Sequence, residues 1–171
     1  SSLLGEWDIP VPENPTLEKL RQIRIDVQKK KREEGAVRGF NHYAHLKDYQ
    51  LTDYIIYNIF PNSVITVGPD GVQLLRPRPH PSDPARCLFD HWWMVPKIEG
   101  RTHTPSPAGG PPLPVEDAEH QAFVYGEKSL GVTADQDLSI GAIQQQGLGS
   151  AGFRDFYLSQ SEIRLQNFHE S

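Results

Sequence analysis

The first regular pattern along the chain is a narrow apolar stripe formed by Leu17, Leu20, Ile23 and Val27. Residues spaced by three and four positions lie on one face of a helix, and the positions between them are mostly charged. Thr16 is a favourable helix start, and Gly35 is a favourable stop. The pattern therefore predicts an amphipathic helix over residues 17–34, and the basic run near its end is expected to be solvated.

Four later segments are rich in β-branched and aromatic residues, which favour strands. They cover residues 53–60, 63–67, 72–76 and 87–95. The sequence Gly68-Pro-Asp-Gly71 is typical of a tight turn, so the second and third segments are expected to form a hairpin. Four prolines within residues 76–84 remove backbone donors, and this stretch is expected to be a loop rather than part of a sheet ladder. The pattern predicts an antiparallel meander of strands.

Helical signals return toward the end of the chain. Thr133 and Gln136 have the spacing of a capping box, and glycines follow a few turns later, so a helix is expected over residues 133–146. A second capping box, Ser159 with Glu162, precedes a final helix near the chain end. The order of helix, antiparallel strands, long loop and late helices predicts an α+β fold whose late helices pack on a curved sheet.

Two segments show no periodic pattern. Residues 1–15 are rich in proline and predict an extended arm that packs on a surface or on a neighbouring chain. Residues 97–115 are rich in proline and glycine and predict a long loop without structure of its own, of the kind that often serves as a lid or a partner contact. At 171 residues the chain is long enough for one core, so a single domain is expected over residues 1–171.

Composition narrows the functional classes. Seventeen basic against 22 acidic residues give a net charge of −5, which argues against a nucleic-acid-binding protein. No apolar run approaches the length of a membrane span, and no signal peptide is recognisable at the start. The single cysteine, Cys87, excludes an internal disulfide and any multi-cysteine metal cluster within these residues. These features predict a cytoplasmic protein without membrane or nucleic-acid partners.

Two pairs of side chains are candidate metal ligands. His42 and His45 are three residues apart and could meet on one helical turn, but their segment shows no helical stripe, and surface or supporting histidines are the alternative. Asp135 and Asp137 lie near the start of the helix expected over residues 133–146. An acidic side chain at a helix start interacts favourably with the helix dipole, and this alone is one explanation of Asp135.

Five short motifs, taken in order, resemble the catalytic domain of Rieske-type non-haem iron oxygenases, the large subunit of aromatic-ring-hydroxylating enzymes. They are Tyr57-Asn-Ile-Phe-Pro-Asn62, Leu75-Arg-Pro77, Trp92-Trp-Met-Val-Pro96, Asp135-Gln-Asp137 followed by Gln145-Gln-Gly-Leu148, and Leu158-Ser-Gln-Ser-Glu162 with Asn167-Phe-His169. Each motif alone is weak, whereas five in the order of the family are fairly specific. Together they cover about residues 50–171.

The resemblance implies a helix-grip, START-like fold, in which an antiparallel sheet wraps around a long C-terminal helix and encloses a substrate cavity. It also implies a mononuclear Fe(II) held by two histidines and one carboxylate, which leaves open positions for O₂ beside the substrate. Asp137 occupies the position of that carboxylate. Asp135 is the alternative ligand, but it projects about 200° away around the helix, so the two side chains cannot face one metal.

The resemblance also identifies what this chain lacks. A Rieske [2Fe–2S] cluster needs two cysteines and two histidines, so the Rieske domain is expected to be absent. The two iron histidines of the family lie five residues apart in a Tyr-His-x₄-His segment that does not occur here, and His42 and His45 have a different spacing. The chain is therefore expected to be the C-terminal part of a catalytic domain, either a fragment or a split subunit, and to be inactive alone.

For the intact enzyme, the resemblance implies electron delivery from a ferredoxin or reductase, a homotrimeric assembly, and O₂-dependent hydroxylation of a small aromatic or apolar substrate. The expected cavity wall consists of Tyr57, Ile59, Val64, Trp92 and Met94. Ordinary core positions are the alternative for these five residues. The competing hypothesis for function is a metal-free helix-grip protein that binds a small ligand.

Overall fold

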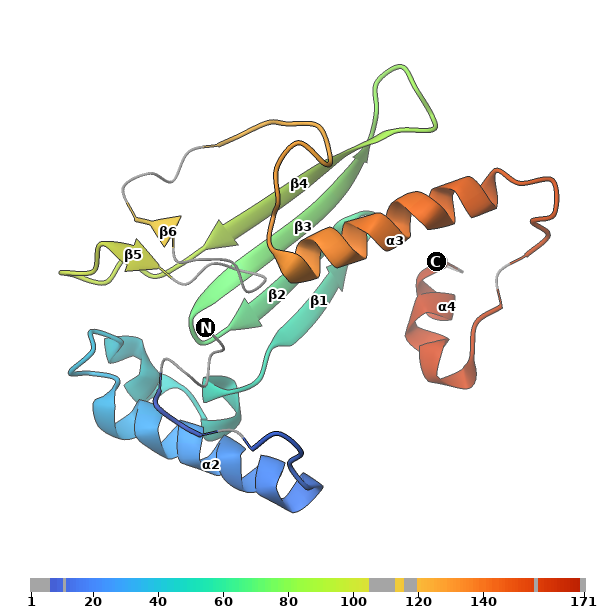
Figure 1. Cartoon of the computed structure of the whole chain (residues 1–171). Helices are drawn as coiled ribbons and strands as arrows, with labels where there is room; N and C mark the ends of the chain where they lie inside the picture. Colours follow the sequence, from blue (N-terminus) through green and yellow to red (C-terminus); the bar gives the residue numbers. More distant parts are fainter. Residues whose placement is uncertain (1–6, 11, 105–112, 116–119, 156, 170–171) are drawn as a thin grey trace.

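A computed structural model describes residues 7–10, 12–104, 113–115, 120–155 and 157–169 of the chain. The helices are α2 (Leu17–Glu34), α3 (Val132–Leu148) and α4 (Ile163–His169), with short 3₁₀ helices η1 (Asn41–His45), η2 (Asp48–Leu51) and η4 (Gln160–Glu162). The strands are β1 (Ile55–Ile59), β2 (Ser63–Gly68), β3 (Gly71–Pro79), β4 (Cys87–Met94), β5 (His103–Thr104) and β6 (Leu113–Pro114). Helices and an antiparallel sheet occupy separate stretches of the chain, so the predicted α+β class is confirmed (Figure 1).

The main sheet has the strand order β1-β2-β3-β4, and each strand is antiparallel to its neighbours in sequence. The predicted meander is therefore confirmed. The β2–β3 hairpin closes on the directly paired residues Gly68 and Gly71, and the turn between them consists of Pro69 and Asp70. A side chain on either glycine would meet an aromatic ring, from Tyr54 at Gly68 and from Trp93 at Gly71. The two glycines thus allow both rings to pack against the hairpin end.

The third strand continues beyond the predicted end. Residues Arg76 to Pro79 pair with residues 87–90 of β4, so the prediction of a loop was wrong for residues 76–79, whereas residues 80–84 do lie outside the strands. The register of β2 on β3 ends at Leu75, which leaves the other edge of β3 uncovered. The Pro77 carbonyl faces that edge, where it accepts a 2.9 Å hydrogen bond from Asn62. Prolines are tolerated there because a missing N–H costs nothing on an unpaired edge.

Two arginines share one carboxylate across the β3–β4 ladder. Arg76 lies directly opposite Asp90 and donates to it from Nε at 2.9 Å, and Arg78 Nε donates to the same oxygen at 2.8 Å. The hydrogen bonds from Arg78 and then from Arg76 lower the pKa of Asp90 to about 2. This ion-pair group fixes the part of the ladder that continues past β2.

The long loop has some regular structure after all. His103 pairs with Pro114 and Thr104 pairs with Leu113, so β5 and β6 form a two-residue antiparallel ladder. The Val115 N–H extends this contact by donating to the Thr102 carbonyl at 2.9 Å. The prediction of a loop without structure of its own was therefore wrong for the described part of residues 97–115, because the two ends of the stretch satisfy one another's backbone groups.

Helix α2 has the predicted bounds and the predicted start. The Lys19 N–H donates to Oγ1 of Thr16 at 3.2 Å, which satisfies one of the free donors of the first turn. Only the second half of the apolar stripe is buried: Ile23 and Val27 are buried, whereas Leu17 is 66% exposed. Lys31, one turn after Val27, is also buried, and α2 therefore presents a cation to the interior.

A small aromatic core joins the arm to the segment after α2. Its fully buried members are Trp7, Phe40, Tyr43 and Leu51. Phe40 and Tyr43 stack with ring centroids 4.8 Å apart, and Trp7 is tilted against both at 6.1 Å. The described part of the arm therefore packs on its own chain.

Lys31 enters this core as half of a buried ion pair. Its Nζ lies 3.0 Å from Oδ2 of Asp70, and the two side chains are only 3% and 11% exposed. Asp70 also accepts a short hydrogen bond from the Tyr43 hydroxyl. The ammonium lies 5.6 Å from the ring centroid of Trp7 and 5.1 Å from that of Tyr43. Because Asp70 is in the β2–β3 turn, this cluster links α2 to the main sheet.

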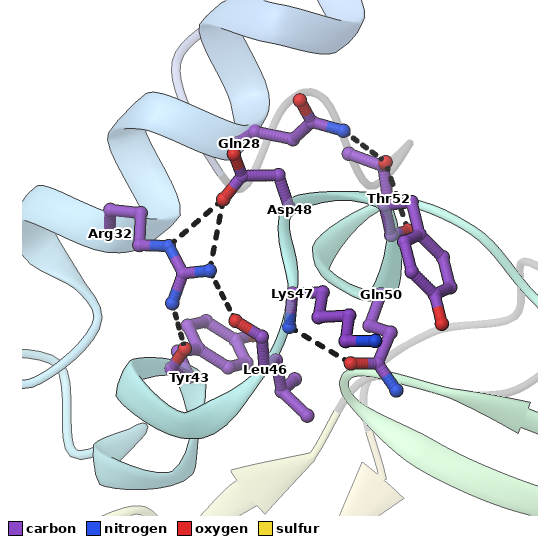
Figure 2. Close-up of polar contacts among 9 residues, drawn as sticks. Gln28, Arg32, Tyr43, Leu46, Lys47, Asp48, Gln50 and Thr52 are labelled. Carbon is purple, nitrogen blue, oxygen red and sulfur yellow. Dashed lines mark hydrogen bonds and ion pairs between the residues drawn. The ribbon is translucent and has the colours of Figure 1, made fainter.

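Arg32, the next residue, fixes the connection to the first strand. Figure 2 shows its guanidinium between the carbonyls of Tyr43 and Leu46 and the carboxylate of Asp48, to which Nε and Nη2 donate at 3.2 and 2.9 Å. The same figure shows Gln28 donating to Thr52, at 3.0 Å. These bonds hold η1 and η2 against α2, and they position the chain as it enters β1.

The late helices differ from the expectation of a sheet wrapped around a long C-terminal helix. The last helix, α4, has seven residues, and α3 has 17. Figure 1 shows α3 crossing the main sheet in this view, yet its apolar residues remain accessible, with Ile140 46% and Ile143 67% exposed. The helix grip is thus not closed in this structure. Among the helices that the structure describes, none has the length and apolar character needed to cross a bilayer.

Candidate functional site

Helix α3 carries the two candidate carboxylates in its first turns. The helix begins at Val132, one residue before Thr133, and its N-cap is Gly131 with φ of 103°. The N-cap is thus Gly131 rather than Thr133, and the Thr133 side chain, on which the predicted capping box depends, lies outside the described residues. The positive φ at position 131 explains the difference, because a glycine adopts this conformation readily and allows the chain to turn sharply into the helix.

Asp135 replaces the predicted cap. Its carboxylate accepts hydrogen bonds from the Ser129 hydroxyl at 2.5 Å and from the Leu130 N–H at 2.9 Å. The bond from Ser129, followed by that from the Leu130 backbone, lowers the pKa of Asp135 below its usual value. Both oxygens therefore stabilise the loop that leads into α3, and the favourable placement at the helix start adds to this. Asp135 has a structural role of its own.

Asp137 lies two residues further along α3 and is exposed. Within the described part of the chain it makes no hydrogen bond or ion pair, in contrast to Asp135. Its direction differs from that of Asp135 because successive helical residues are rotated by about 100°. Asp137 is the carboxylate of the pair that is available to an additional ligand.

His42 and His45 lie on η1, and among the described residues neither makes a hydrogen bond or a ring contact with α3. His42 Nε2 is 2.8 Å from the carbonyl of Pro69, and its ring packs edge-on to Phe40 and Tyr43. His45 is exposed. In residues 7–10, 12–104, 113–115, 120–155 and 157–169, no three side chains of histidine, cysteine, aspartate or glutamate are grouped as a metal site.

The strand register divides the five expected wall residues between the two faces of the sheet. Side chains alternate along a strand, and directly paired residues share a face. Tyr57, Ile59, Trp92 and Met94 lie on one face, which we call the Tyr57 face. Val64 lies on the opposite face, the Val64 face. The five residues therefore cannot line one wall together.

The two faces differ in their polar content. The Tyr57 face carries the ion pairs of Asp90 with Arg76 and Arg78. Asp90 is two residues from Trp92 on β4, so its side chain lies on the same face as Trp92, and Arg76 is directly opposite Asp90 on β3. Its apolar members are half exposed, with Tyr57 at 52% and Trp92 at 48%. Met94 lines an open hollow of about 310 Å³ at the end of the sheet, beside His42 and the β2–β3 turn.

The Val64 face has uncharged polar residues instead. Leu75 lies between Val64 and His91 in one row of the sheet, and Gln73 lies between Thr66 and Trp93 in the next row. Gln73 Nε2 and His91 Nε2 are 2.9 Å apart, which makes a hydrogen bond along this face. Burial lowers the pKa of His91 below its usual 6.5, so the imidazole is neutral at pH 7.

The sequence reasoning missed Gln73 and His91. Their alternation with Leu75 and Trp93 was visible in the sequence, but their pairing depends on the register of β4 against β3. That register follows from the loop of residues 80–86 and from the ion pairs of Asp90, neither of which is encoded in a local pattern.

The sequence of nearly the whole chain matches one protein family. A profile of the family described as "Ring hydroxylating alpha subunit (catalytic domain)" matches residues 11–171. Comparisons with curated proteins and with solved structures gave no significant match. The profile covers the sheet, α3 and both candidate carboxylates, so the resemblance noted from five short motifs extends over α2 as well. The chain belongs to the family of ring-hydroxylating alpha-subunit catalytic domains.

Proposed function

We propose that this chain is part of the catalytic domain of a ring-hydroxylating oxygenase, in which Asp137 is the carboxylate ligand of a mononuclear Fe(II). The family match over residues 11–171 is the observation that carries this proposal. The local geometry supports Asp137 over Asp135, since Ser129 and Leu130 already occupy both oxygens of Asp135. An exposed carboxylate without a protein partner can bind a metal without first breaking structural hydrogen bonds.

The described residues do not make a complete iron site. No three ligating side chains are grouped among them, and His42 contacts the Pro69 carbonyl in the β2–β3 turn instead. One carboxylate does not hold Fe(II) against water, so the chain alone is expected to be inactive. In an intact enzyme, the iron supplies O₂ activation, and the role of this chain is to orient one ligand and to form part of the substrate wall.

We assign that wall to the Val64 face of the sheet. A wall for a small aromatic or apolar substrate needs apolar surface with a few neutral polar groups, and Val64, Leu75 and Trp93 with Gln73 and His91 meet this description. The Tyr57 face is less suitable for an apolar substrate.

The ion pairs of Asp90 explain the difference. An apolar ligand placed over Arg76, Arg78 and Asp90 would remove water from charged groups, which costs free energy. The outer surface of the sheet is then formed by Tyr57, Ile59, Trp92 and Met94. A ligand that bound the Tyr57 face instead would make these four residues the wall.

The proposed enzyme also needs parts that the described residues do not supply. They are the iron histidines, a Rieske [2Fe–2S] cluster on another domain, and a ferredoxin or reductase that supplies electrons. A homotrimer is the proposed assembly of the parent enzyme. The family match also favours an oxygenase over a metal-free helix-grip protein that binds a small ligand, since the matching profile describes catalytic domains.

A chimeric enzyme tests the role of Asp137. Residues 11–171 replace the matching segment of an active ring-hydroxylating alpha subunit, whose own upstream chain supplies the histidines and the cluster. Asp137→Asn is expected to lose bound iron and hydroxylation together. Asp135→Asn, the matched control on the same helix, is expected to keep both, because an amide oxygen still accepts one of its two hydrogen bonds. Equal iron content in the two variants would contradict the assignment.

A further inference from the structure

The Val64 face carries one polar pair that the proposed iron site does not use. Gln73 and His91 are joined by the 2.9 Å contact between their side-chain nitrogens, and neither has another hydrogen bond with the residues that the structure describes. An amide nitrogen only donates, so His91 Nε2 accepts and the imidazole proton is on Nδ1. The pair therefore has three open positions: the Nδ1–H donor of His91, and the second Nε2–H donor and the Oε1 acceptor of Gln73.

This pattern does not depend on the orientation of the amide. If the Gln73 amide is turned over, its oxygen accepts from His91 Nε2–H, and the pair is left with both amide N–H donors of Gln73 and an Nδ1 acceptor. In both arrangements two donors and at least one acceptor remain, on neighbouring strands. The neutral state of His91 at pH 7, favoured by its burial, is consistent with either arrangement.

The surroundings of the pair are mainly apolar, apart from Thr66 and the buried indole N–H of Trp93, which has no partner among the described residues. Leu75 is directly opposite His91, Trp93 is directly opposite Gln73, and Val64 is opposite Leu75 on its other side. Gln73 and His91 are both partly buried. A ligand that covers this part of the face removes water from these open donors and the open acceptor, so a ligand that replaces a lost hydrogen bond binds better than one that replaces none.

We propose that Gln73 and His91 select aromatic substrates that carry a hydroxyl group over the corresponding hydrocarbons. A hydroxyl group both donates and accepts, so it can accept from an open N–H of the pair or donate to its open acceptor, whereas a hydrocarbon leaves every open position without a partner. A carboxylate would satisfy the donor but would place its charge against the acceptor. This inference rests on the proposed function, because it assumes that the substrate lies on the Val64 face.

The test uses the whole chain with two probes of matched shape, 2-naphthol and naphthalene, in ¹H–¹⁵N NMR titrations at pH 7. We expect 2-naphthol to bind about tenfold more tightly, the difference that one or two neutral hydrogen bonds give. Its chemical-shift changes are expected to centre on residues 64–66, 73–75 and 91–93. His91→Leu and Gln73→Leu are expected to reduce the preference to about onefold to twofold.

Two further variants separate recognition from folding. His91→Asn introduces an amide that both donates and accepts, and it is expected to retain most of the preference for 2-naphthol. His45→Leu changes an exposed histidine on η1 and is expected to leave both affinities unchanged. If His91→Leu loses the preference but His91→Asn keeps it, the hydrogen bonds rather than the stability of the sheet are responsible.

Three outcomes would overturn the inference, and they differ in what they say about the proposed function. Equal affinity of the wild-type chain for both probes would refute the polar selection but leave an aromatic-binding wall in place. Shifts centred on Tyr57 and Trp92 would refute the selection and move the wall to the Tyr57 face. Failure of the chain to bind either probe would refute the selection and count against the proposed wall.

Discussion

The buried ion pair of Lys31 and Asp70 gives the sharpest prediction about stability. Its atoms are 3.0 Å apart and its side chains are almost inaccessible. At an effective dielectric constant near 20, the attraction at this distance is about 5.5 kcal/mol. Replacing Asp70 by asparagine removes this attraction and leaves the ammonium of Lys31 buried without a counter-charge. Breaking such a pair from one side costs about 3–5 kcal/mol.

We expect Asp70→Asn to lower the free energy of unfolding by about 3 kcal/mol, the low end of that range, because two interactions of Lys31 remain. The rings of Trp7 and Tyr43 still face the ammonium, and the asparagine oxygen can still accept a hydrogen bond from it. A typical domain is stable by only about 5–15 kcal/mol, so the loss is a large fraction of the total.

Urea denaturation measures this change. Far-ultraviolet circular dichroism and tryptophan fluorescence are followed together, and coincident transitions justify the two-state treatment. Asp53→Asn is the matched control: it removes an equally short ion pair, 2.8 Å from Arg24, whose side chains are 41% and 50% exposed. This control is expected to cost less than about 1 kcal/mol.

A double variant distinguishes charge burial from packing. Lys31→Met with Asp70→Asn removes both charges, and it is expected to recover at least half of the loss caused by Asp70→Asn alone. The reasoning is refuted if Asp70→Asn costs no more than Asp53→Asn, or if the double variant is less stable than Asp70→Asn.

Three further predictions concern the sheet. The pKa of Asp90 is lowered to about 2, so the stability from its ion pairs is complete above about pH 4 and is lost as the pH falls toward 2. The stability difference between wild type and Asp90→Asn, measured in urea melts, should therefore shrink between pH 6 and pH 3. A constant difference would contradict this. Gly68→Ala should lower stability by about 1–3 kcal/mol because its Cβ overlaps the Tyr54 ring, and calorimetry should find a much smaller loss in a Tyr54→Ala background. Because burial lowers the pKa of His91, an NMR titration of its ring protons should give a midpoint below 6.5, and a midpoint above that value would disprove the burial argument.

Local signals in the sequence predicted the elements whose causes are local. The bounds of α2 followed from Thr16, Gly35 and the spacing of apolar residues, and the β2–β3 hairpin followed from its turn sequence. The start of α3 was missed by one residue because a glycine with positive φ, rather than a side-chain cap, begins the helix. The prolines of β3 were misread because their effect depends on whether a neighbouring strand covers that edge.

Nonlocal contacts decided the rest. Lys31 stands in a run of four basic residues, which suggests a solvated helix end, yet it is buried because Asp70 lies 39 residues away at the tip of a hairpin. The division of the expected wall residues between two faces needed the strand register. Residue types identified the candidates, but the partners of each side chain determined its role.

Paramagnetic NMR of the ¹⁵N-labelled chain with Fe(II), kept free of oxygen, tests the central assignment most directly. Weak binding at Asp137 should broaden the amide signals of residues 136–141 more than those elsewhere. The broadening should disappear in Asp137→Asn and persist in Asp135→Asn. Broadening that is unchanged in Asp137→Asn, or that centres on Asp135 or on His42 and His45, would contradict the assignment of Asp137 as the iron ligand.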